Sequence, residues 1–330
     1  MKLATLAQGG PDGTLAVVAA DATRLLVADG IAPTLQAALE DWRRCAPQLR
    51  ALSDRLTRGD GASTEGLRFA APLPRAWQWL DGSAYRSHTA LLDRLFGRDA
   101  SPVERPLMYQ GLSHQFIGPT DDVPLPRESD DIDFEGEFGV ITDAVPMGIS
   151  ADDAVSHIKL VVVINDWSLR AFANSEKKTG FGWILAKPAC SMAPFAVTPD
   201  ELAEAWRDAR VHLHLTVDWN GKRFGNADGG AMAHGFDELI AHAAGTRALC
   251  AGTIIGSGTV SNDDYREVGS SCIAERRAIE LLDHGETRTP FMRFGDSVRI
   301  ESRLPDGDVL FGAIEQRVVP GHDAAPAAAR

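Results

Sequence analysis

Alternating apolar and acidic residues between positions 131 and 140 form the clearest pattern in this chain. One side of the two-residue repeat is apolar (Ile132, Phe134, Phe138 and Val140), and the other side is acidic (Asp131, Asp133, Glu135 and Glu137). A repeat of two predicts a β-strand with one face of each kind. On such a strand Glu135 and Glu137 point the same way, about 6.5–7 Å apart. Two like charges at that separation repel unless a cation lies between them, and hard divalent cations prefer oxygen ligands.

The same residues allow two other interpretations of this stretch. An acidic strand face can simply be solvated surface. The segment from Asp131 to Gly136 also imitates the first six positions of an EF-hand calcium loop. In that motif the twelfth position must be a bidentate Glu, and here it is Thr142. The missing ligand and the apolar alternation exclude the EF-hand.

A second segment strengthens the metal hypothesis. The run 160–164 (Leu-Val-Val-Val-Ile) is continuously apolar and β-branched, which predicts a strand buried on both faces. Asp166 follows its end, where an unpaired carboxylate is costly unless it binds a cation. The residue could instead cap a helix that begins at Trp167. With Glu135 and Glu137, Asp166 would complete a three-carboxylate site for Mg²⁺ or Ca²⁺.

The rest of the chain gives a mixed pattern. Short strand patterns at 2–7, 15–18 and 24–27 precede helical spacing at 34–44 and 47–58. Asp81 or Ser83 can cap a helix that runs to Leu95 and ends at Gly97. Beyond residue 105, strands dominate, with helices expected at 151–158, 199–208 and 237–249. This order is not a regular βαβ alternation, so it favours an α+β or mainly β fold over a doubly wound one.

The same pattern suggests the domain organisation. We expect a small mixed N-terminal domain over residues 1–72. The Pro-rich stretch 70–75 is expected to be a linker or the entry to the next domain. A larger mixed β domain over 73–320 follows. The Ala-rich tail 321–330 is expected to be disordered.

Composition narrows the class of partner. The 330 residues are 44% hydrophobic and carry a formal net charge of −13, which argues against nucleic acid and acidic membranes as partners. The sequence contains neither an apolar run of membrane-spanning length nor a leader-like start. Four scattered cysteines predict reduced thiols in a cytoplasmic protein (Cys45, Cys190, Cys250 and Cys272).

Four motifs together resemble the fumarylacetoacetate hydrolase family. They are Glu-Gly-Glu at 135–137, Asn-Asp-Trp-Ser-Leu-Arg at 165–170, Lys187 after a Gly/aromatic stretch, and Gly-Ser-Gly-Thr-Val-Ser at 256–261. The resemblance spans roughly residues 75–320, and the first part resembles the small domain of the longer, fumarylacetoacetase-type members. It implies a mixed β-roll catalytic domain, a homodimer, and one Mg²⁺ or Ca²⁺ ion.

The resemblance also implies roles for individual residues. The metal ligands would be Glu135, Glu137 and Asp166, with Asp81 as a fourth carboxylate. His88, seven residues after Asp81, would be the catalytic base, oriented by Glu275, and Lys187 would stabilise the oxyanion. Contacts to substrate would come from Tyr109, Arg170 and Thr259. One departure concerns Ala173, which stands where long members carry a substrate-binding Gln, and another is the composition of segment 175–180.

The chemistry expected from these residues is hydrolysis of a C–C bond in a β-diketo acid or acylpyruvate, with fumarylacetoacetate as the leading candidate. A chelated dicarbonyl, an imidazole-activated water and a positioned ammonium group meet its needs. A decarboxylase, hydratase or isomerase acting on 2-oxo acids is the alternative within the family. A non-catalytic protein in which the ion only stabilises the fold is a third hypothesis, but it leaves the Asp81–His88 pair unexplained.

Overall fold

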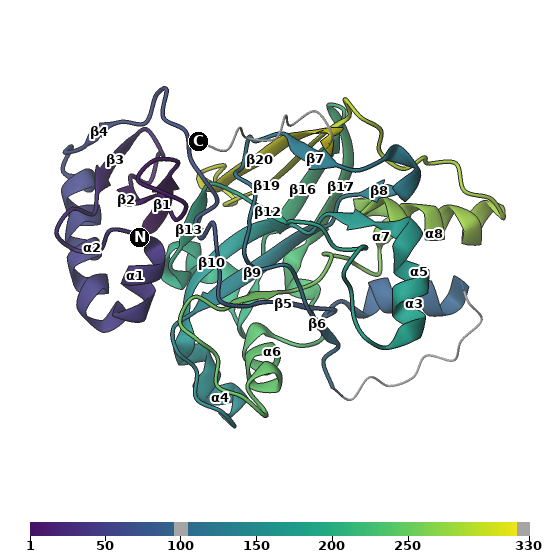
Figure 1. Ribbon diagram of the computed structural model, residues 1–330, viewed down its shortest axis with the longest axis horizontal. Coiled ribbons are helices and arrows are strands. Elements are labelled where there is room, and N and C mark those ends of the chain that lie inside the picture. Colours follow the sequence, from purple (N-terminus) through teal and green to yellow (C-terminus); the bar gives the residue numbers. More distant parts are fainter. Residues whose placement is uncertain (96–104, 322–330) are drawn as a thin grey trace, which may run out of the picture.

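The computed structural model describes residues 1–95 and 105–321, which form two sheets flanked by helices (Figure 1). The expected helix end at Gly97 and nearly all of the expected tail, 322–330, lie outside these ranges. The strands of the larger sheet, in spatial order, are β4 (Ala62–Ser63), β3 (Arg24–Val27), β2 (Thr14–Val18), β1 (Lys2–Leu6), β13 (Phe195–Val197), β10 (Ile158–Asn165), β9 (Gly136–Thr142), β18 (Ile254–Gly256), β5 (Trp79–Gly82) and β6 (Met108–Gln110), with β12 (Ser191–Met192) beside β10.

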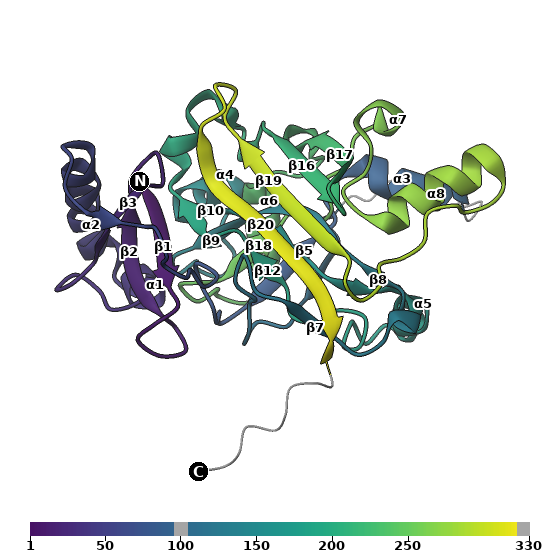
Figure 2. The ribbon, with the colours of Figure 1, turned by 90° about the horizontal axis from the view of Figure 1, so that it is seen from above.

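The second sheet packs across the larger one and crosses over its middle in Figure 2. Its strands, in spatial order, are β17 (Lys222–Asp228), β16 (His214–Trp219), β19 (Ser297–Arg303), β20 (Val309–Pro320) and β7 (Val123–Leu125). Two small pairs complete the strands, namely β8 (Ile132–Asp133) with β11 (Ser168–Leu169), and β14 (Trp206–Arg207) with β15 (Arg210–Val211). The observed architecture agrees with the expected mixed α+β, mainly β class.

The helices lie around the sheets (Figure 1). The α-helices are α1 (Leu35–Glu40), α2 (Trp42–Thr57), α3 (Arg86–Leu95), α4 (Ala151–Ala154), α5 (Arg170–Thr179), α6 (Phe236–Ala243), α7 (Tyr265–Val268) and α8 (Ile273–His284). Short 3₁₀ turns span Glu128–Asp130, Val155–His157, Pro199–Ala205 and Gly229–Ala231. Among the described residues no helix combines the length and the apolar character that a membrane crossing requires.

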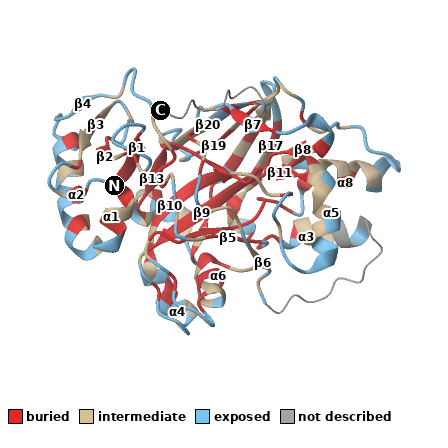
Figure 3. Cartoon of the chain, in the orientation of Figure 1, coloured by how far each residue is buried: buried red, intermediate tan, exposed pale blue. Residues whose placement is uncertain are grey.

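Strand β10 shows why its sequence is continuously apolar. Its side chains alternate between two separate hydrophobic cores, with Val161 and Val163 in one and Leu160, Val162 and Ile164 in the other. All five are fully buried, and Figure 3 shows the central strands as buried along most of their length. A strand covered on both faces needs apolar residues at every position. The prediction for this segment is confirmed.

The N-terminal residues do not form a detached unit. Strand β1 pairs with β13, so the larger sheet runs without a break from the small domain into the main one. The same core contains Leu3 and Leu49 from the first part and Ile254 from β18. The expected linker 70–75 is in part buried, since Ala71, Pro72 and Leu73 have almost no exposed surface. The two parts therefore share one sheet and one hydrophobic core.

Several helix assignments from sequence were wrong in their bounds; the helix expected at 237–249, for example, spans Phe236–Ala243, and the segment 199–208 forms a 3₁₀ turn that ends at Ala205. The break between the first two helices falls at Asp41, not near residue 45, and Pro47 lies inside α2. A proline in the second turn costs a backbone hydrogen bond, but the buried face carrying Cys45, Leu49 and Leu56 outweighs it. Helix α3 begins at Arg86, so Asp81 is outside it.

Candidate active site

Asp81 lies on strand β5, so the expectation that it caps the helix that carries His88 was wrong. Strand β5 pairs in parallel with β18 and antiparallel with β6. The backbone N–H of Gly258 donates to Asp81 Oδ1 at 3.1 Å. Gly258 has φ +78°, and a Cβ there would lie 2.4 Å from the Gly82 carbonyl oxygen. Only glycine allows this approach, which explains part of the glycine-rich motif at 256–261.

Glu137 and Asp166 come from the neighbouring strands β9 and β10. Glu137 is opposite Ile164 in the antiparallel register, and Asp166 directly follows the end of β10. Oxygen atoms of Asp81, Glu137 and Asp166 all lie within 4.8 Å of one another, and all three residues are buried. Asp166 does not cap a helix, because α5 begins four residues later at Arg170. We refer to these three residues as the carboxylate cluster.

Glu137 is the most informative member of the cluster. Both of its carboxylate oxygens are buried, and neither has a hydrogen-bond partner among the described residues. Burial, followed by the charges of Asp81 and Asp166, raises the pKa of Glu137 well above its usual range. Burial and the charge of Asp166 do the same to the pKa of Asp81. A buried, unpartnered carboxylate requires a physical explanation. A divalent cation held by these oxygens supplies one, so the donor set fits a hard ion such as Mg²⁺, Mn²⁺ or Ca²⁺.

Glu135, one of the three main ligands predicted from sequence, is not a member of that three-residue group, and Asp81, predicted as the fourth carboxylate, is. Its Oε1 accepts a hydrogen bond from Arg170 at 2.5 Å, and its Oε2 accepts one from Lys187 at 2.8 Å. Burial raises the pKa of Glu135, but the charges of Lys187 and Arg170 outweigh it and lower the pKa overall. Glu135 is thus a paired carboxylate beside the cluster. The single strand predicted over 131–140 is also interrupted, because β8 ends before Phe134 and β9 begins after Glu135.

The acidic side of the 131–140 pattern is not solvated surface. Asp133 is fully buried, and its oxygens accept hydrogen bonds from the N–H groups of Ile273 and Ala274 at 2.7 and 2.9 Å. These are N–H groups of the first turn of α8, which otherwise lack partners. Arg170 Nε also donates to Asp133, at 2.8 Å. Asp133 therefore fixes α8 and Arg170 at once.

Asp166 is surrounded by donors on its other side. Lys187 Nζ and the Tyr109 hydroxyl each donate to Asp166 Oδ2 at 2.6 Å, and Cys190 Sγ donates to Oδ1 at 3.0 Å. The predicted substrate contact Tyr109 thus bonds a predicted metal ligand. Burial lowers the pKa of Lys187, but the charges of Asp166 and Glu135 outweigh it and raise the pKa overall, so the ammonium is retained.

His88 and Glu275 come together although 187 residues separate them. His88 Nδ1 lies 2.9 Å from Glu275 Oε2, and the Ser261 hydroxyl donates to the other oxygen at 3.1 Å. The Glu275 side chain is fully buried, whereas that of His88 keeps 18% of its surface exposed. An ionised carboxylate can only accept, so Nδ1 donates and Nε2 remains free to accept a proton.

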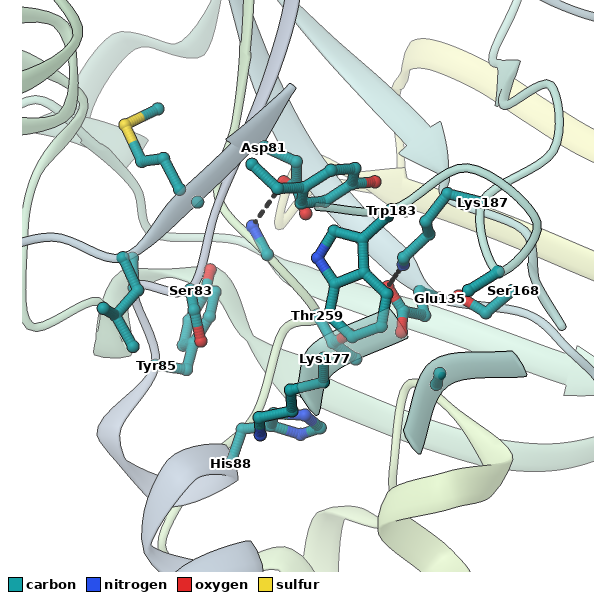
Figure 4. A pocket seen from close by; sticks show the side chains of 18 of the residues that line it. Asp81, Ser83, Tyr85, His88, Glu135, Ser168, Lys177, Trp183, Lys187 and Thr259 are labelled. Carbon is teal, nitrogen blue, oxygen red and sulfur yellow. Dashed lines mark hydrogen bonds and ion pairs between the residues drawn. The ribbon is translucent and has the colours of Figure 1, made fainter. Parts of the chain in front are cut away.

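A pocket of about 300 Å³ connects these groups (Figure 4). Its lining includes seven of the ten predicted site residues (Asp81, His88, Tyr109, Glu135, Arg170, Lys187 and Thr259). Glu137 and Asp166 lie behind this lining, next to Asp81, and Glu275 lies behind His88. The volume suits a small organic ligand.

Several lining residues were not anticipated. They include Ser83, Tyr85, Lys177 and Trp183. Trp183 packs edge-on against Tyr109, with ring centroids 6.3 Å apart. The only signal for Trp183 in the sequence was its place between Gly182 and Lys187, and a single aromatic residue in a loop does not indicate which way it faces.

Comparison with known proteins identifies the family. Residues 78–319 match the family described as fumarylacetoacetate (FAA) hydrolase C-terminal, and residues 1–75 match fumarylacetoacetase N-terminal domain 2. The chain belongs to the fumarylacetoacetate hydrolase family. The resemblance drawn from the four motifs is therefore confirmed, as is the fold it implied.

Relatives with named activities catalyse different reactions. A 2,4-didehydro-3-deoxy-L-rhamnonate hydrolase of Sphingomonas sp. (strain SKA58) is 30% identical over 157 residues, which are 47% of this chain and 52% of that protein. An oxaloacetate tautomerase of Xenopus laevis is 25% identical over 171 residues, 51% of each protein. The match thus spans about half the length of these curated relatives.

A solved structure shows the same fold over nearly the whole chain. Maleylpyruvate hydrolase from Sphingobium sp. SYK-6, in complex with manganese (II) ion and pyruvate, superposes with a TM-score of 0.66 at 19% identity, covering 97% of this chain and 100% of that one. The family thus includes hydrolases and tautomerases, and a divalent metal in this chain is consistent with the carboxylate cluster.

Proposed function

We propose that this protein is a metal-dependent hydrolase that cleaves a C–C bond in a β-diketo acid or acylpyruvate, with fumarylacetoacetate as the leading candidate. The observation that carries the proposal concerns the two Glu137 oxygens, which have no hydrogen-bond partner in the described part of the chain. They lie next to Asp81 and Asp166, behind a pocket that is also lined by His88. A cation site and a carboxylate-supported imidazole on one pocket are the parts that such a hydrolysis needs.

Asp81, Glu137 and Asp166 would hold the divalent ion, with Glu135 close by. When bound, such an ion polarises a chelated carbonyl and lowers the energy of the developing enolate. The residues of the chain would supply the proton transfers. His88 Nε2 would take a proton from water as the water attacks the acyl carbonyl, while Glu275 holds the ring through Nδ1. The resulting imidazolium can return that proton to the leaving carbon.

Lys187 would stabilise the oxyanion that forms when water adds to the carbonyl. Its ammonium lines the pocket and is held by Glu135 and Asp166 at 2.8 and 2.6 Å, which fixes its direction before substrate binds. A preorganised cation in a buried site stabilises developing negative charge more than a mobile one does. Arg170, which bridges Asp133 and Glu135, would mainly keep Glu135 in place.

The test is an absorbance screen of fumarylacetoacetate and acylpyruvates with the metal-loaded protein, with and without EDTA. We expect metal-dependent cleavage of at least one compound. His88→Ala should lower kcat by about 10²–10⁴-fold, because it removes the general base. Mn²⁺ binding at the carboxylate cluster, measured by calorimetry, should be unchanged, since His88 is not one of its three residues. Unchanged turnover in that variant would remove His88 from the mechanism.

The alternative is a tautomerase, isomerase or decarboxylase acting on a 2-oxo acid. It is supported by the similarity to an oxaloacetate tautomerase. These reactions use enolate stabilisation but no hydrolytic water. Product analysis with oxaloacetate separates the two: enol–keto exchange or CO₂ release without cleavage of any acylpyruvate would favour the alternative.

A further inference from the structure

Hydrophobic burial holds only part of the segment between α5 and Lys187. Three of its apolar side chains face solvent, with 98% of Phe181, 79% of Ile184 and 57% of Leu185 exposed, whereas Trp183 is half-buried and Ala186 is buried. Gly180 and Gly182 both have positive φ angles, and a Cβ at either would meet nothing within 4 Å. A loop with two glycines and outward apolar residues needs some other interaction to keep one conformation.

The carboxylate of Glu176 provides that interaction. It accepts hydrogen bonds from three successive backbone N–H groups, those of Ile184 at 3.1 Å, Leu185 at 2.8 Å and Ala186 at 3.0 Å. Burial raises the pKa of Glu176, but the three N–H groups outweigh it and lower the pKa. Hydrogen bonds to an ionised acceptor are about twice as strong as neutral ones. One side chain on α5 therefore clamps the end of the loop.

The clamped segment carries a wall of the pocket. Trp183 lines the cavity and contacts the Tyr109 ring, whose hydroxyl donates to Asp166. Lys187, which bridges Glu135 and Asp166, comes directly after Ala186. The clamp thus lies one residue from the oxyanion candidate, although Glu176 itself is not among the lining residues.

We propose that Glu176 is a positioning residue that fixes Trp183 and Lys187 for the reaction. The consequence for turnover rests on the proposed function, whereas the clamp itself does not. Misplacing a reacting group by about 1 Å can cost about a hundredfold in rate. Loss of the clamp should therefore weaken catalysis without removing any group that touches substrate.

Hydrogen exchange of peptides that cover residues 183–187 tests the clamp in the full-length protein, with no substrate needed. We expect slow exchange in the wild type, fast exchange in Glu176→Ala and intermediate exchange in Glu176→Gln, which retains one acceptor oxygen. Lys178→Ala is the matched control, because Lys178 is exposed on the same helix and does not line the pocket. Equal exchange in Glu176→Ala and wild type would overturn the proposal.

The kinetic test uses whichever substrate the screen identifies. Glu176→Ala should lower kcat/KM by about 10- to 100-fold, Glu176→Gln less, and Lys178→Ala not at all. In a Trp183→Ala background the Glu176 effect should shrink, because part of what the clamp positions is gone. Full additivity of the two substitutions would contradict a positioning role. If the wild type turns over no substrate, the proposed function fails while the exchange result still decides the clamp.

Discussion

Two groups of buried carboxylates lie side by side at and behind the pocket wall, and they differ in the charges around them. Glu135 and Asp133 are paired with Arg170 and Lys187, so the chain itself supplies the compensating charge. In the carboxylate cluster, Asp166 shares the Lys187 ammonium with Glu135. The other two members lack such a cation: among the described residues Glu137 has no hydrogen-bond partner, and Asp81 has only the Gly258 N–H. Burying charge without compensation is expensive. The comparison teaches that the charges of the first group are compensated within the fold, whereas Glu137 and Asp81 lack a cation of the chain and fit one from outside.

The largest effect, on metal affinity and turnover, should come from a substitution of Glu137 in the carboxylate cluster. Glu137→Gln keeps the shape but removes the charge that a cation needs. We expect Mn²⁺ affinity to fall by more than the roughly 10–100-fold that loss of an outer-shell partner costs, and turnover to be lost. Metal-free thermal stability should not decrease, because no paired charge is broken. Calorimetry with Mn²⁺ and thermal melts with and without EDTA measure both. A clearly lower metal-free Tm would mean that Glu137 stabilises the fold by itself.

The next effect is the matched change in the paired group. Glu135→Gln leaves Lys187 and Arg170 each with one carboxylate in place of two. Breaking a buried pair costs about 3–5 kcal/mol, and we expect about 3 kcal/mol because each cation keeps a partner. The free energy of unfolding in urea, measured without metal, gives the value. The comparison between the two groups fails if Glu135→Gln and Glu137→Gln change the metal-free free energy of unfolding by the same amount.

The pH dependence of stability should differ between metal-free and metal-loaded protein. The pKa values of Asp81 and Glu137 are raised in the folded state, so the metal-free fold binds more protons than the unfolded chain. Their contribution is fully present below the ordinary carboxyl pKa of about 4 and is lost as the pH rises through the raised values. Thermal melts across this pH range should show that, as the pH rises, the Tm of the metal-free wild type decreases more than the Tm of metal-free Glu137→Gln. Parallel curves would argue against a raised pKa in Glu137.

The smallest effect should come from an exposed pair. Arg50 and Asp200 join α2 to the turn after β13 at 2.9 Å, but both side chains are about half exposed. Arg50→Met should change the free energy of unfolding by no more than about 1 kcal/mol, because solvent screens the pair. Urea unfolding checks this, and a loss comparable to that in Glu135→Gln would show that burial does not set the difference.

The sequence by itself determined the local features of this protein. Uninterrupted apolar residues fixed β10 as a doubly covered strand, and Asp166 at its end followed from chain order. The four motifs identified the family, because their order and spacing can be read directly from the linear sequence. Period-two alternation placed Glu135 and Glu137 near each other, although it could not show that β8 and β9 are separate.

Only the tertiary structure decided which carboxylates are paired. Arg170 and Lys187 reach Glu135 across 35 and 52 residues, and Gly258 reaches Asp81 across 177. Asp81 and His88 are seven residues apart in the sequence, but they meet at the pocket from a strand and a separate helix. Hydrogen bonds and charge depend on distances in space, and these are set by how strands far apart in sequence pack, which no local pattern encodes.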